Sequence, residues 1–207
     1  MRFALIPVKE LSQAKARLAP VLDAARRREL ALALFRDVLA AALACRALDG
    51  VAVVTRDADV LSIAAEAGAE GLPEPGGLNE ALTSASKTLA QRGADRLVVL
   101  AADLALATAT DIQAVAEAEA DVVVVPSTDG GTNALALRPG AIAFQFGPDS
   151  AQRHLAAARE AGLRVLLLDL PALSIDIDTP EDLDGVRARA RQGYAVGRNT
   201  LNSIDKN

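Results

Sequence analysis

The chain is poor in the side chains on which several kinds of binding site depend. Its 207 residues include one cysteine, one histidine, no tryptophan and 2% aromatic residues. A lone cysteine, Cys45, excludes a disulfide framework and a cysteine-based zinc site. Few aromatic rings are present for stacking on bases, and a net charge of −5 provides no basic face for a phosphate backbone. We therefore expect a protein that binds no nucleic acid.

Long apolar runs are absent as well. No stretch reaches the roughly 20 residues that a membrane-spanning helix requires. The apolar start, over residues 1–7, is too short for the hydrophobic core of a signal peptide and is typical of a β-strand. From these two observations we expect a cytoplasmic protein with no membrane partner.

Two common glycine-rich nucleotide-binding motifs are also missing. The chain has no GxxxxGK[ST] phosphate-binding loop and no GxGxxG turn after its first predicted strand. The second absence counts against a nicotinamide-dependent oxidoreductase, because such enzymes bind their cofactor at that turn.

What the chain does have is a regular alternation of apolar strands and amphipathic helices. Its residues are 51% hydrophobic, enough for the core of one ordinary domain. The alternation predicts a three-layer α/β fold with a mainly parallel sheet. Predicted strands cover residues 3–8, 51–55, 69–72, 97–102, 121–126 and 164–168, and predicted helices cover residues 23–45, 57–67, 78–93, 111–119 and 151–161.

The alternation fails after residue 126. A glycine-bearing loop over residues 127–133 leads directly into an apolar run, too soon for a parallel crossover. We expect an antiparallel or edge excursion near residues 132–138, followed by a lid-like segment that ends at Pro148. We expect residues 1–192 to form a single domain. Residues 193–207 are polar and without periodicity, which predicts a loosely held C-terminal tail.

The strand over residues 97–102 runs directly into Asp103. Open α/β sheets bind ligands beyond the carboxyl ends of such strands, so this carboxylate is a candidate site residue. Two other interpretations are open from this stretch alone. Asp103 would be either a solvated loop residue or a cap for the helix that begins near Thr108.

A pair of carboxylates follows later, at Asp176 and Asp178. In an extended segment, residues two apart project to the same face, and two carboxylates there repel unless a cation lies between them. Thr179 and Asp182 fit a helix capping box, which leaves Asp176 and Asp178 free. Together with Asp103 they form a set of hard oxygen ligands that suits Mg²⁺.

Two groups of residues are candidates for binding phosphate. Lys9, Lys15 and Arg17 follow the first strand and can form a cradle for a triphosphate, although solvated loop lysines are common. Gly147 and Ser150 stand at the start of a predicted helix, where exposed amides bind anions. Ser150 can equally be a simple helix cap.

Asn79 has two interpretations: it caps the helix that begins there, or it reads the edge of a nucleobase. His154 is the only histidine, and a lone histidine on a helix is more often structural than catalytic. A metal site with two phosphate-binding regions indicates transfer between two phosphate-bearing molecules. An ionised phosphate nucleophile needs no general base, which agrees with the scarcity of histidine and cysteine.

Seven short motifs occur in an order that points to one family. They are Pro7-Val8-Lys9, Ala14-Lys15-Ala16-Arg17-Leu18, Gly77-Leu78-Asn79, Ala102-Asp103-Leu104, Gly131-Thr132-Asn133-Ala134, Phe146-Gly147-Pro148-Asp149-Ser150 with His154, and Asp176-Ile177-Asp178-Thr179-Pro180-Glu181-Asp182-Leu183. Over residues 1–186 the chain resembles the CofC/FbiD guanylyltransferases of coenzyme F-420 biosynthesis. It departs from the family pattern at Ala105, where proline is usual.

The resemblance implies a fold like that of nucleotide-diphospho-sugar transferases. It also implies an enzyme that joins GTP to 2-phospho-L-lactate, phosphoenolpyruvate or 3-phosphoglycerate, with release of pyrophosphate. The segment over residues 146–150 is similar to that of bacterial members, which favours phosphoenolpyruvate. The implied residues are magnesium ligands at Asp103, Asp176 and Asp178, contacts to the acid at Thr132, Gly147 and Ser150, and guanine contacts around Gly77 and Asn79.

The main alternative is another nucleotidyltransferase of the same fold that acts on a sugar phosphate or a pterin. Those enzymes typically begin with an LxGGxxxR loop, where this chain has Pro7-Val8-Lys9. A non-catalytic nucleotide-binding subunit would have lost one of the metal carboxylates, and all three are present. Because many α/β domains of this size dimerise, a homodimer is also possible.

Overall fold

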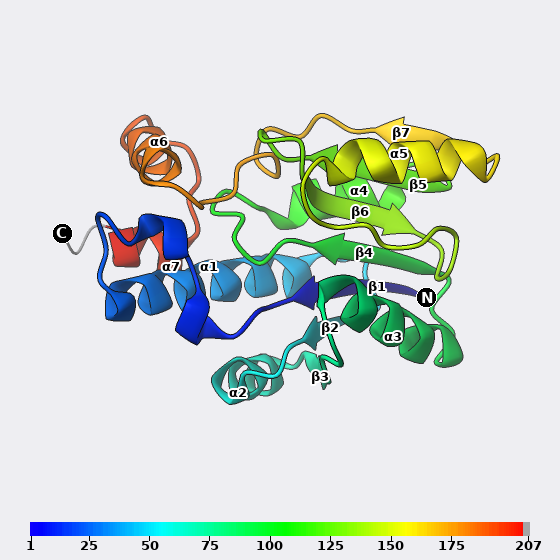
Figure 1. The fold of residues 1–207 in the computed structure, drawn as a ribbon, viewed down its shortest axis with the longest axis horizontal. Helices are drawn as coiled ribbons and strands as arrows, with labels where there is room; N and C mark the ends of the chain where they lie inside the picture. Colours follow the sequence, from blue (N-terminus) through cyan, green and yellow to red (C-terminus); the bar gives the residue numbers. More distant parts are fainter. Residues whose placement is uncertain (205–207) are drawn as a thin grey trace.

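Short runs of valine, leucine and alanine form the centre of the molecule as one seven-stranded sheet (Figure 1). The computed structural model describes residues 1–204. The strand order is β3-β2-β1-β4-β6-β5-β7. The strands are β1 (Arg2–Pro7), β2 (Gly50–Val54), β3 (Glu70–Leu72), β4 (Arg96–Leu100), β5 (Val122–Pro126), β6 (Thr132–Leu137) and β7 (Val165–Leu167).

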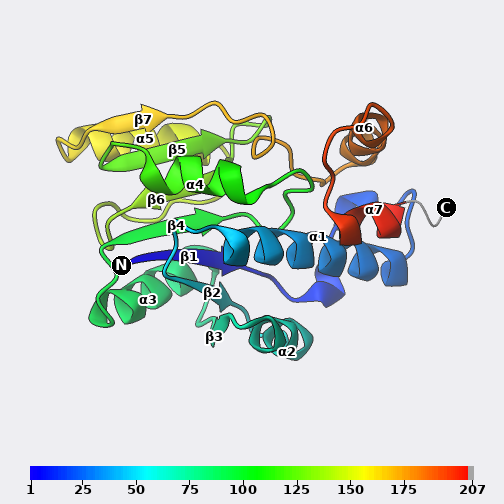
Figure 2. The same cartoon turned by 180° about the vertical axis from the view of Figure 1, so that it is seen from behind.

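Helices cover both faces of this sheet, which gives the predicted three-layer α/β architecture (Figures 1 and 2). Alternate strand residues point to opposite faces, as in any β-strand. Ala4 and Ile6 of β1 belong to the core shared with α1, α2 and α4, whereas Leu5 belongs to the core shared with α3 and α5. The helices are α1 (Ala24–Ala44), α2 (Ala58–Ala67), α3 (Leu78–Gln91), α4 (Ala109–Glu117), α5 (Ser150–Glu160), α6 (Pro180–Arg191) and α7 (Arg198–Ile204), with short 3₁₀ turns η1 (Leu11–Gln13) and η2 (Ala16–Leu18).

The expected antiparallel excursion is strand β6, and it lies inside the sheet. It pairs antiparallel with β4 on one side and with β5 on the other, and all six of its residues are buried. The loop between β5 and β6 is too short for a crossover, so the chain turns back beside β5. As a result, the first residues of β6 lie level with the carboxyl ends of the parallel strands.

Local capping signals place most helix starts where the sequence predicts them. Asp57 caps α2, and Thr108 and Thr179 form capping boxes at α4 and α6. The three other capping interpretations are wrong. The N-cap of α4 is Thr108, so Asp103 does not cap that helix. The N-cap of α3 is Gly77 rather than Asn79, and the N-cap of α5 is the residue before Ser150.

Strand β7 is shorter than the apolar run over residues 164–168 predicts. It has three residues and pairs only with β5, at the edge of the sheet. Leu167 is 52% exposed, because one side of an edge strand has no neighbouring strand. No helix within residues 1–204 combines the length and the apolar composition needed to span a membrane.

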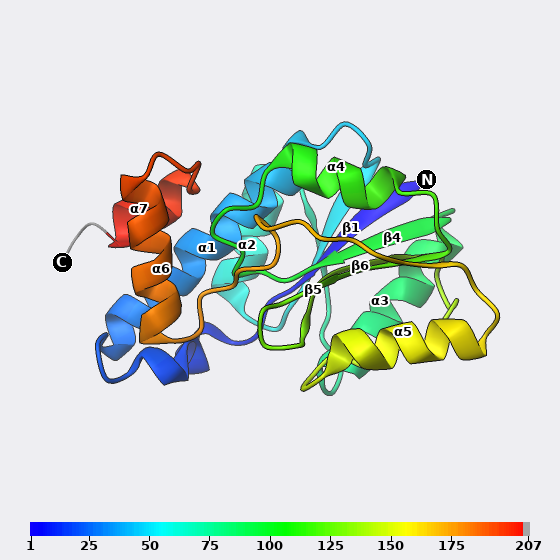
Figure 3. The same ribbon diagram turned by 90° about the horizontal axis from the view of Figure 1, so that it is seen from above.

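The C-terminal segment differs from the loosely held tail that its polar sequence predicts. Arg198–Ile204 forms α7, which packs beside α1 and α6 (Figure 3). The carboxylate of Asp37 in α1 accepts hydrogen bonds from the main-chain N–H groups of Asn199 and Thr200, at 3.1 and 2.7 Å. A residue more than 160 positions away therefore caps α7, and no local pattern signals it. Residues 205–207 of the predicted tail lie outside the described residues.

Replacement of Asp37 tests this remote cap. Asp37→Ala leaves two N-terminal amides of α7 without their acceptor, so we expect the free energy of unfolding to fall by about 1–2 kcal/mol. Urea denaturation measures this loss. Asp184→Ala is the control, because Asp184 is exposed and pairs with Arg187 on the surface of α6, where a lost ion pair costs little. Equal urea midpoints for the two variants would contradict the assignment.

Candidate active site

The carboxyl ends of β1, β2 and β4 border a cavity of about 860 Å³. Its wall includes Pro7, Val54 and Ala101 from these strand ends, and Thr132 from the start of β6. This is the position that open α/β sheets use for ligands, and the volume suits a nucleotide-sized molecule.

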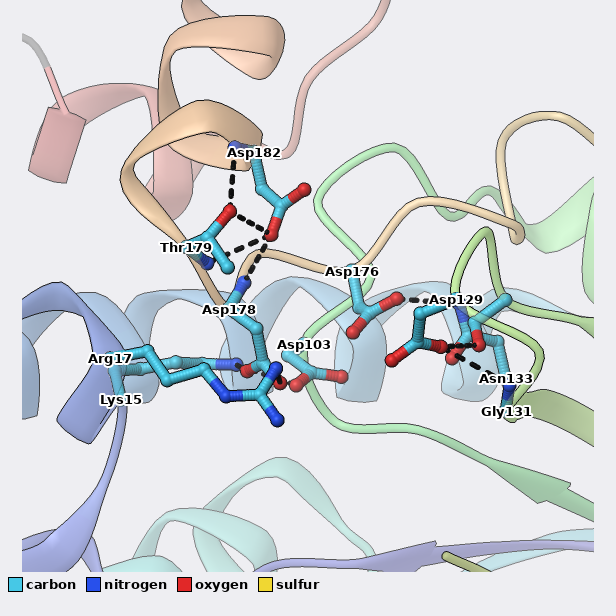
Figure 4. A network of polar contacts seen from close by, with 11 residues as sticks. Lys15, Arg17, Asp103, Asp129, Gly131, Asn133, Asp176, Asp178, Thr179 and Asp182 are labelled. Atoms are coloured by element: carbon cyan, nitrogen blue, oxygen red, sulfur yellow. Dashed lines mark hydrogen bonds and ion pairs between the residues drawn. The ribbon is translucent and has the colours of Figure 1, made fainter. Parts of the chain in front are cut away.

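Three carboxylates meet at this cavity, as the sequence predicts. Asp103 follows β4, and Asp176 and Asp178 lie in the extended segment before α6 (Figure 4). One oxygen from each carboxylate lies within 4.8 Å of the others. Ile177, between the two later aspartates, is fully buried in a cluster with α1 and α6, so its neighbours project the other way, toward the cavity.

The capping box of α6 fixes the main chain beside these carboxylates. The carboxylate of Asp182 accepts hydrogen bonds from the N–H groups of Asp178 and Thr179, at 3.1 and 2.8 Å (Figure 4). Asp182 therefore caps the helix, as expected from its spacing, and is not a fourth member of the cluster.

Lys15 is the internal counterion of the cluster. Its Nζ donates to Asp103 Oδ2 at 2.5 Å and to Asp178 Oδ1 at 2.9 Å, and its side chain is 8% exposed. Burial alone would lower the pKa of Lys15, but the charges of Asp103 and Asp178 outweigh it, and the pKa is raised. The residue has φ of 53°, an uncommon conformation for a residue with a side chain.

The other two predicted cations are more loosely placed. The Arg17 guanidinium is 68% exposed and lies 3.9 Å from Asp178 Oδ2. Lys9 lines the cavity from the loop after β1. Of the three, only Lys15 is built into the cluster.

Asp176 has a partner that no local sequence pattern predicts. Asn133, the second residue of β6, donates from Nδ2 to Asp176 Oδ1 at 3.1 Å. Burial and then the nearby Asp103 charge raise the pKa of Asp176 to about 6, while this hydrogen bond opposes the shift. The Gly131-Thr132-Asn133-Ala134 motif contained the signal, but a contact across 43 residues has no local spacing to reveal it.

The charge balance of this cluster suits a hard cation. Three carboxylates face one buried lysine, and after burial the charges of Asp103 and Asp178 add to the raised pKa of Asp176. Carboxylate oxygens at this spacing are the ligands that divalent ions such as Mg²⁺ take in nucleotide-binding sites.

The predicted acid-binding residues also line the cavity. Thr132, Gly147 and Ser150 all border it. The Thr132 and Ser150 hydroxyl oxygens lie 3.0 Å apart, and Thr132 Oγ1 lies 3.1 Å from His154 Nδ1. Gly147 has φ of 131°, which favours glycine at this turn.

The predicted guanine-binding residues divide into two roles. Gly77 borders the cavity at the N-terminus of α3, where main-chain N–H groups are exposed. The side-chain amide of Asn79 is used by the main chain of Phe146: Asn79 Oδ1 accepts from its N–H at 2.8 Å, and Nδ2 donates to its carbonyl at 3.1 Å. Arg56, which the sequence analysis did not consider, also lines the cavity and donates to the Gly76 carbonyl at 3.0 Å.

His154 is fully buried, and its protonation opposes folding. Burial and then the charge of Arg153 lower the pKa of His154 from 6.5 to about 4. The unfolded chain therefore binds this proton first as the pH falls. Above pH 6.5 the neutral ring of His154 causes no loss of stability. Between about pH 6.5 and pH 4 the free energy of unfolding falls, because the unfolded chain takes up the proton and the folded chain does not.

A pH series tests this linkage. We expect the wild type to lose up to about 3 kcal/mol more unfolding free energy than His154→Phe between pH 7 and pH 4.5. Urea denaturation at each pH measures the difference, and the variant serves as the control for all other titrating groups. Parallel pH profiles for the two proteins would contradict the lowered pKa.

Comparisons with known proteins agree with this geometry. The family described as "Guanylyl transferase CofC like" matches residues 1–202. A phosphoenolpyruvate guanylyltransferase from Sphaerobacter thermophilus is 44% identical over 195 residues, which cover 92% of this chain and 94% of the relative. A 2-phospho-L-lactate guanylyltransferase from Methanothermobacter thermautotrophicus is 40% identical over 184 residues, which cover 87% of this chain and 81% of the relative.

The fold has a close structural counterpart. A crystal structure of a provisionally assigned nucleotide-diphospho-sugar transferase from Desulfovibrio desulfuricans superposes with a TM-score of 0.79 and 21% identity, covering 99% of this chain and 97% of the other. This likeness confirms the predicted fold class. With the family match over nearly the whole length and relatives above 40% identity, the chain belongs to the CofC-like guanylyl transferases.

Proposed function

We propose that this protein transfers GMP from GTP to the phosphate of a small three-carbon phospho-acid and releases pyrophosphate. Phosphoenolpyruvate is the favoured acceptor, with 2-phospho-L-lactate and 3-phosphoglycerate as the other candidates, in coenzyme F-420 biosynthesis. The observation that carries the proposal is one cavity that both a carboxylate–lysine cluster and a buried hydroxyl pair border. The names of the relatives support the choice of nucleotide and acid.

Asp103, Asp176 and Asp178 would hold Mg²⁺. When bound, this ion supplies positive charge that offsets the negative charge on the phosphate under attack. Lys15 reaches Asp103 and Asp178 directly, so it holds two of these carboxylates in position and limits their mutual repulsion.

GTP would lie along the carboxyl ends of β1 and β4. Lys15, Arg17 and Lys9 offer cations to its triphosphate, with Lys9 and Arg17 free to move because they are exposed. The guanine would lie near Gly77 at the start of α3. Asn79 would not contact the guanine directly, because its side-chain amide is hydrogen-bonded to the main chain of Phe146 and holds that residue in place.

The acid would bind at Thr132, Gly147 and Ser150, where hydroxyl and main-chain donors suit its phosphate and carboxylate oxygens. An oxygen of the acid's phosphate then forms a bond to the α-phosphorus of GTP. The bond from that phosphorus to the bridging oxygen breaks in line, and pyrophosphate leaves with the electron pair. The attacking phosphate is already ionised, so the chain need not provide a general base.

Three sequence predictions remain predictions: a single domain over residues 1–192, a cytoplasmic location and a homodimer.

Substrate selection tests the proposed reaction directly. We expect pyrophosphate release from GTP and Mg²⁺ with phosphoenolpyruvate, slower release with the other two acids, and none after chelation of the metal. A coupled phosphate assay measures the rates. Release only with a sugar phosphate would favour the alternative nucleotidyltransferase.

Replacement of Asp103 tests the proposed metal site most directly. Asp103→Asn keeps the shape of the side chain but removes its charge, so we expect kcat/KM to fall at least about 100-fold. The fold should persist, because Lys15 keeps Asp178 as a partner. Asp184→Asn, on the exposed surface of α6, is the matched control. Near-normal turnover by a folded Asp103→Asn protein would be incompatible with the assigned metal site.

A further inference from the structure

A buried chain of polar groups connects the segment before α5 to the cavity. The main-chain N–H of Gln145 donates to His154 Nε2 at 3.0 Å. His154 Nδ1 lies 3.1 Å from Thr132 Oγ1, which in turn lies 3.0 Å from Ser150 Oγ. His154 and Ser150 are at most 1% exposed and Thr132 is 7% exposed, so the chain is closed to solvent except where Thr132 and Ser150 border the cavity.

The first link sets the tautomer of His154. A main-chain N–H can only donate, so Nε2 of His154 must be the unprotonated nitrogen. The neutral ring then carries its proton on Nδ1, which donates to Thr132 Oγ1. The lowered pKa of His154 agrees with a neutral ring.

A count of protons shows what this tautomer does. Thr132 and Ser150 carry two hydroxyl protons, and one is used in the hydrogen bond between them. Since His154 donates to Thr132, it accepts neither of them. One hydroxyl proton of the pair therefore has no acceptor in this chain of contacts, and both residues border the cavity. With the opposite tautomer, Nδ1 would accept that proton and the pair would have none to offer.

We propose that His154 is a positioning residue, which acts through Thr132 to make the Thr132–Ser150 pair a hydrogen-bond donor for an anionic oxygen of the acid. This role rests on the proposed function, because it assigns the donated proton to the acceptor substrate. A phosphate or carboxylate oxygen fits such a donor, whereas a ligand group that can only donate does not.

The surroundings of Gln145 hold the first donor in place. The ring of the next residue, Phe146, packs edge-on against His154 with centroids 4.9 Å apart. Asn79 fixes both the N–H and the carbonyl of Phe146. These contacts anchor the residue that directly follows Gln145, so the main chain that carries the Gln145 N–H is restrained beside His154, which favours a single tautomer.

The tautomer can be observed directly, without any substrate. His154 is the only histidine in the chain, so ¹⁵N-labelled protein gives one set of imidazole signals. At pH 7.5 we expect long-range ¹H–¹⁵N spectra to show a protonated Nδ1 and an unprotonated Nε2. A protonated Nε2 would overturn the proposal, whether or not the protein transfers GMP.

Two isosteric variants separate positioning from a general structural role. The amide nitrogen of His154→Asn takes the place of Nδ1 and can still donate to Thr132, whereas His154→Gln places its amide near Nε2 and cannot. We expect the KM for phosphoenolpyruvate to rise about tenfold in His154→Gln and to change less than threefold in His154→Asn. The KM for GTP should stay within twofold in both.

A double variant tests the route through Thr132. Thr132→Val should raise the KM for the acid, and adding His154→Gln to it should cause no further rise. An independent, multiplicative effect of His154→Gln would overturn the proposal, as would equal changes for acid and GTP in stably folded variants. A wild type inactive with all three acids would instead refute the proposed function, and with it the role in acid binding.

Discussion

The site depends on the need to hold like charges together. Asp103, Asp176 and Asp178 come from two distant parts of the chain, and their oxygens meet within 4.8 Å. Without compensation, such a group would push its segments apart or take up protons. Lys15 supplies compensation from a third segment, and its burial makes the ion pairs strong but also costly to break.

Apolar packing provides the force that opposes this repulsion. Leu18, Ala105 and Ile177 belong to one buried cluster with the start of α1, α6 and α7. Each of them lies within three residues of a charged member of the site. The cluster therefore fixes the backbones of the three charged segments through their apolar side chains. The charged side chains of the same segments point away from the cluster and line the cavity. Helix α7 contributes Ile204 to this cluster, and its preceding Gly197 donates to the Ala105 carbonyl at 2.9 Å.

The predictions that succeeded were those whose causes are local in sequence. The buried strands, the start of α4 near Thr108, the capping box at Thr179 and the position of Asp103 directly after β4 follow from neighbouring residues. The features that the sequence did not reveal depend on distant partners. Asp37 caps α7, Asn133 holds Asp176, and Asn79 holds Phe146, each across 43 or more residues. Ser150 resembles a cap by spacing, yet its hydroxyl is used by Thr132.

The antiparallel direction of β6 brings two polar residues with different partners to the cavity. A parallel strand reaches this edge with its last residue, whereas β6 begins there, so Thr132 and Asn133 stand beside the carboxyl ends of β4 and β5. Asn133 faces the carboxylate cluster, while Thr132 joins the hydroxyl pair. The carboxylate cluster can thus balance its charge with a cation, whereas the hydroxyl pair can offer neutral donors to an anionic oxygen. Neutral donors also explain why a histidine can be buried there without a counterion, since its work requires a fixed proton rather than a charge.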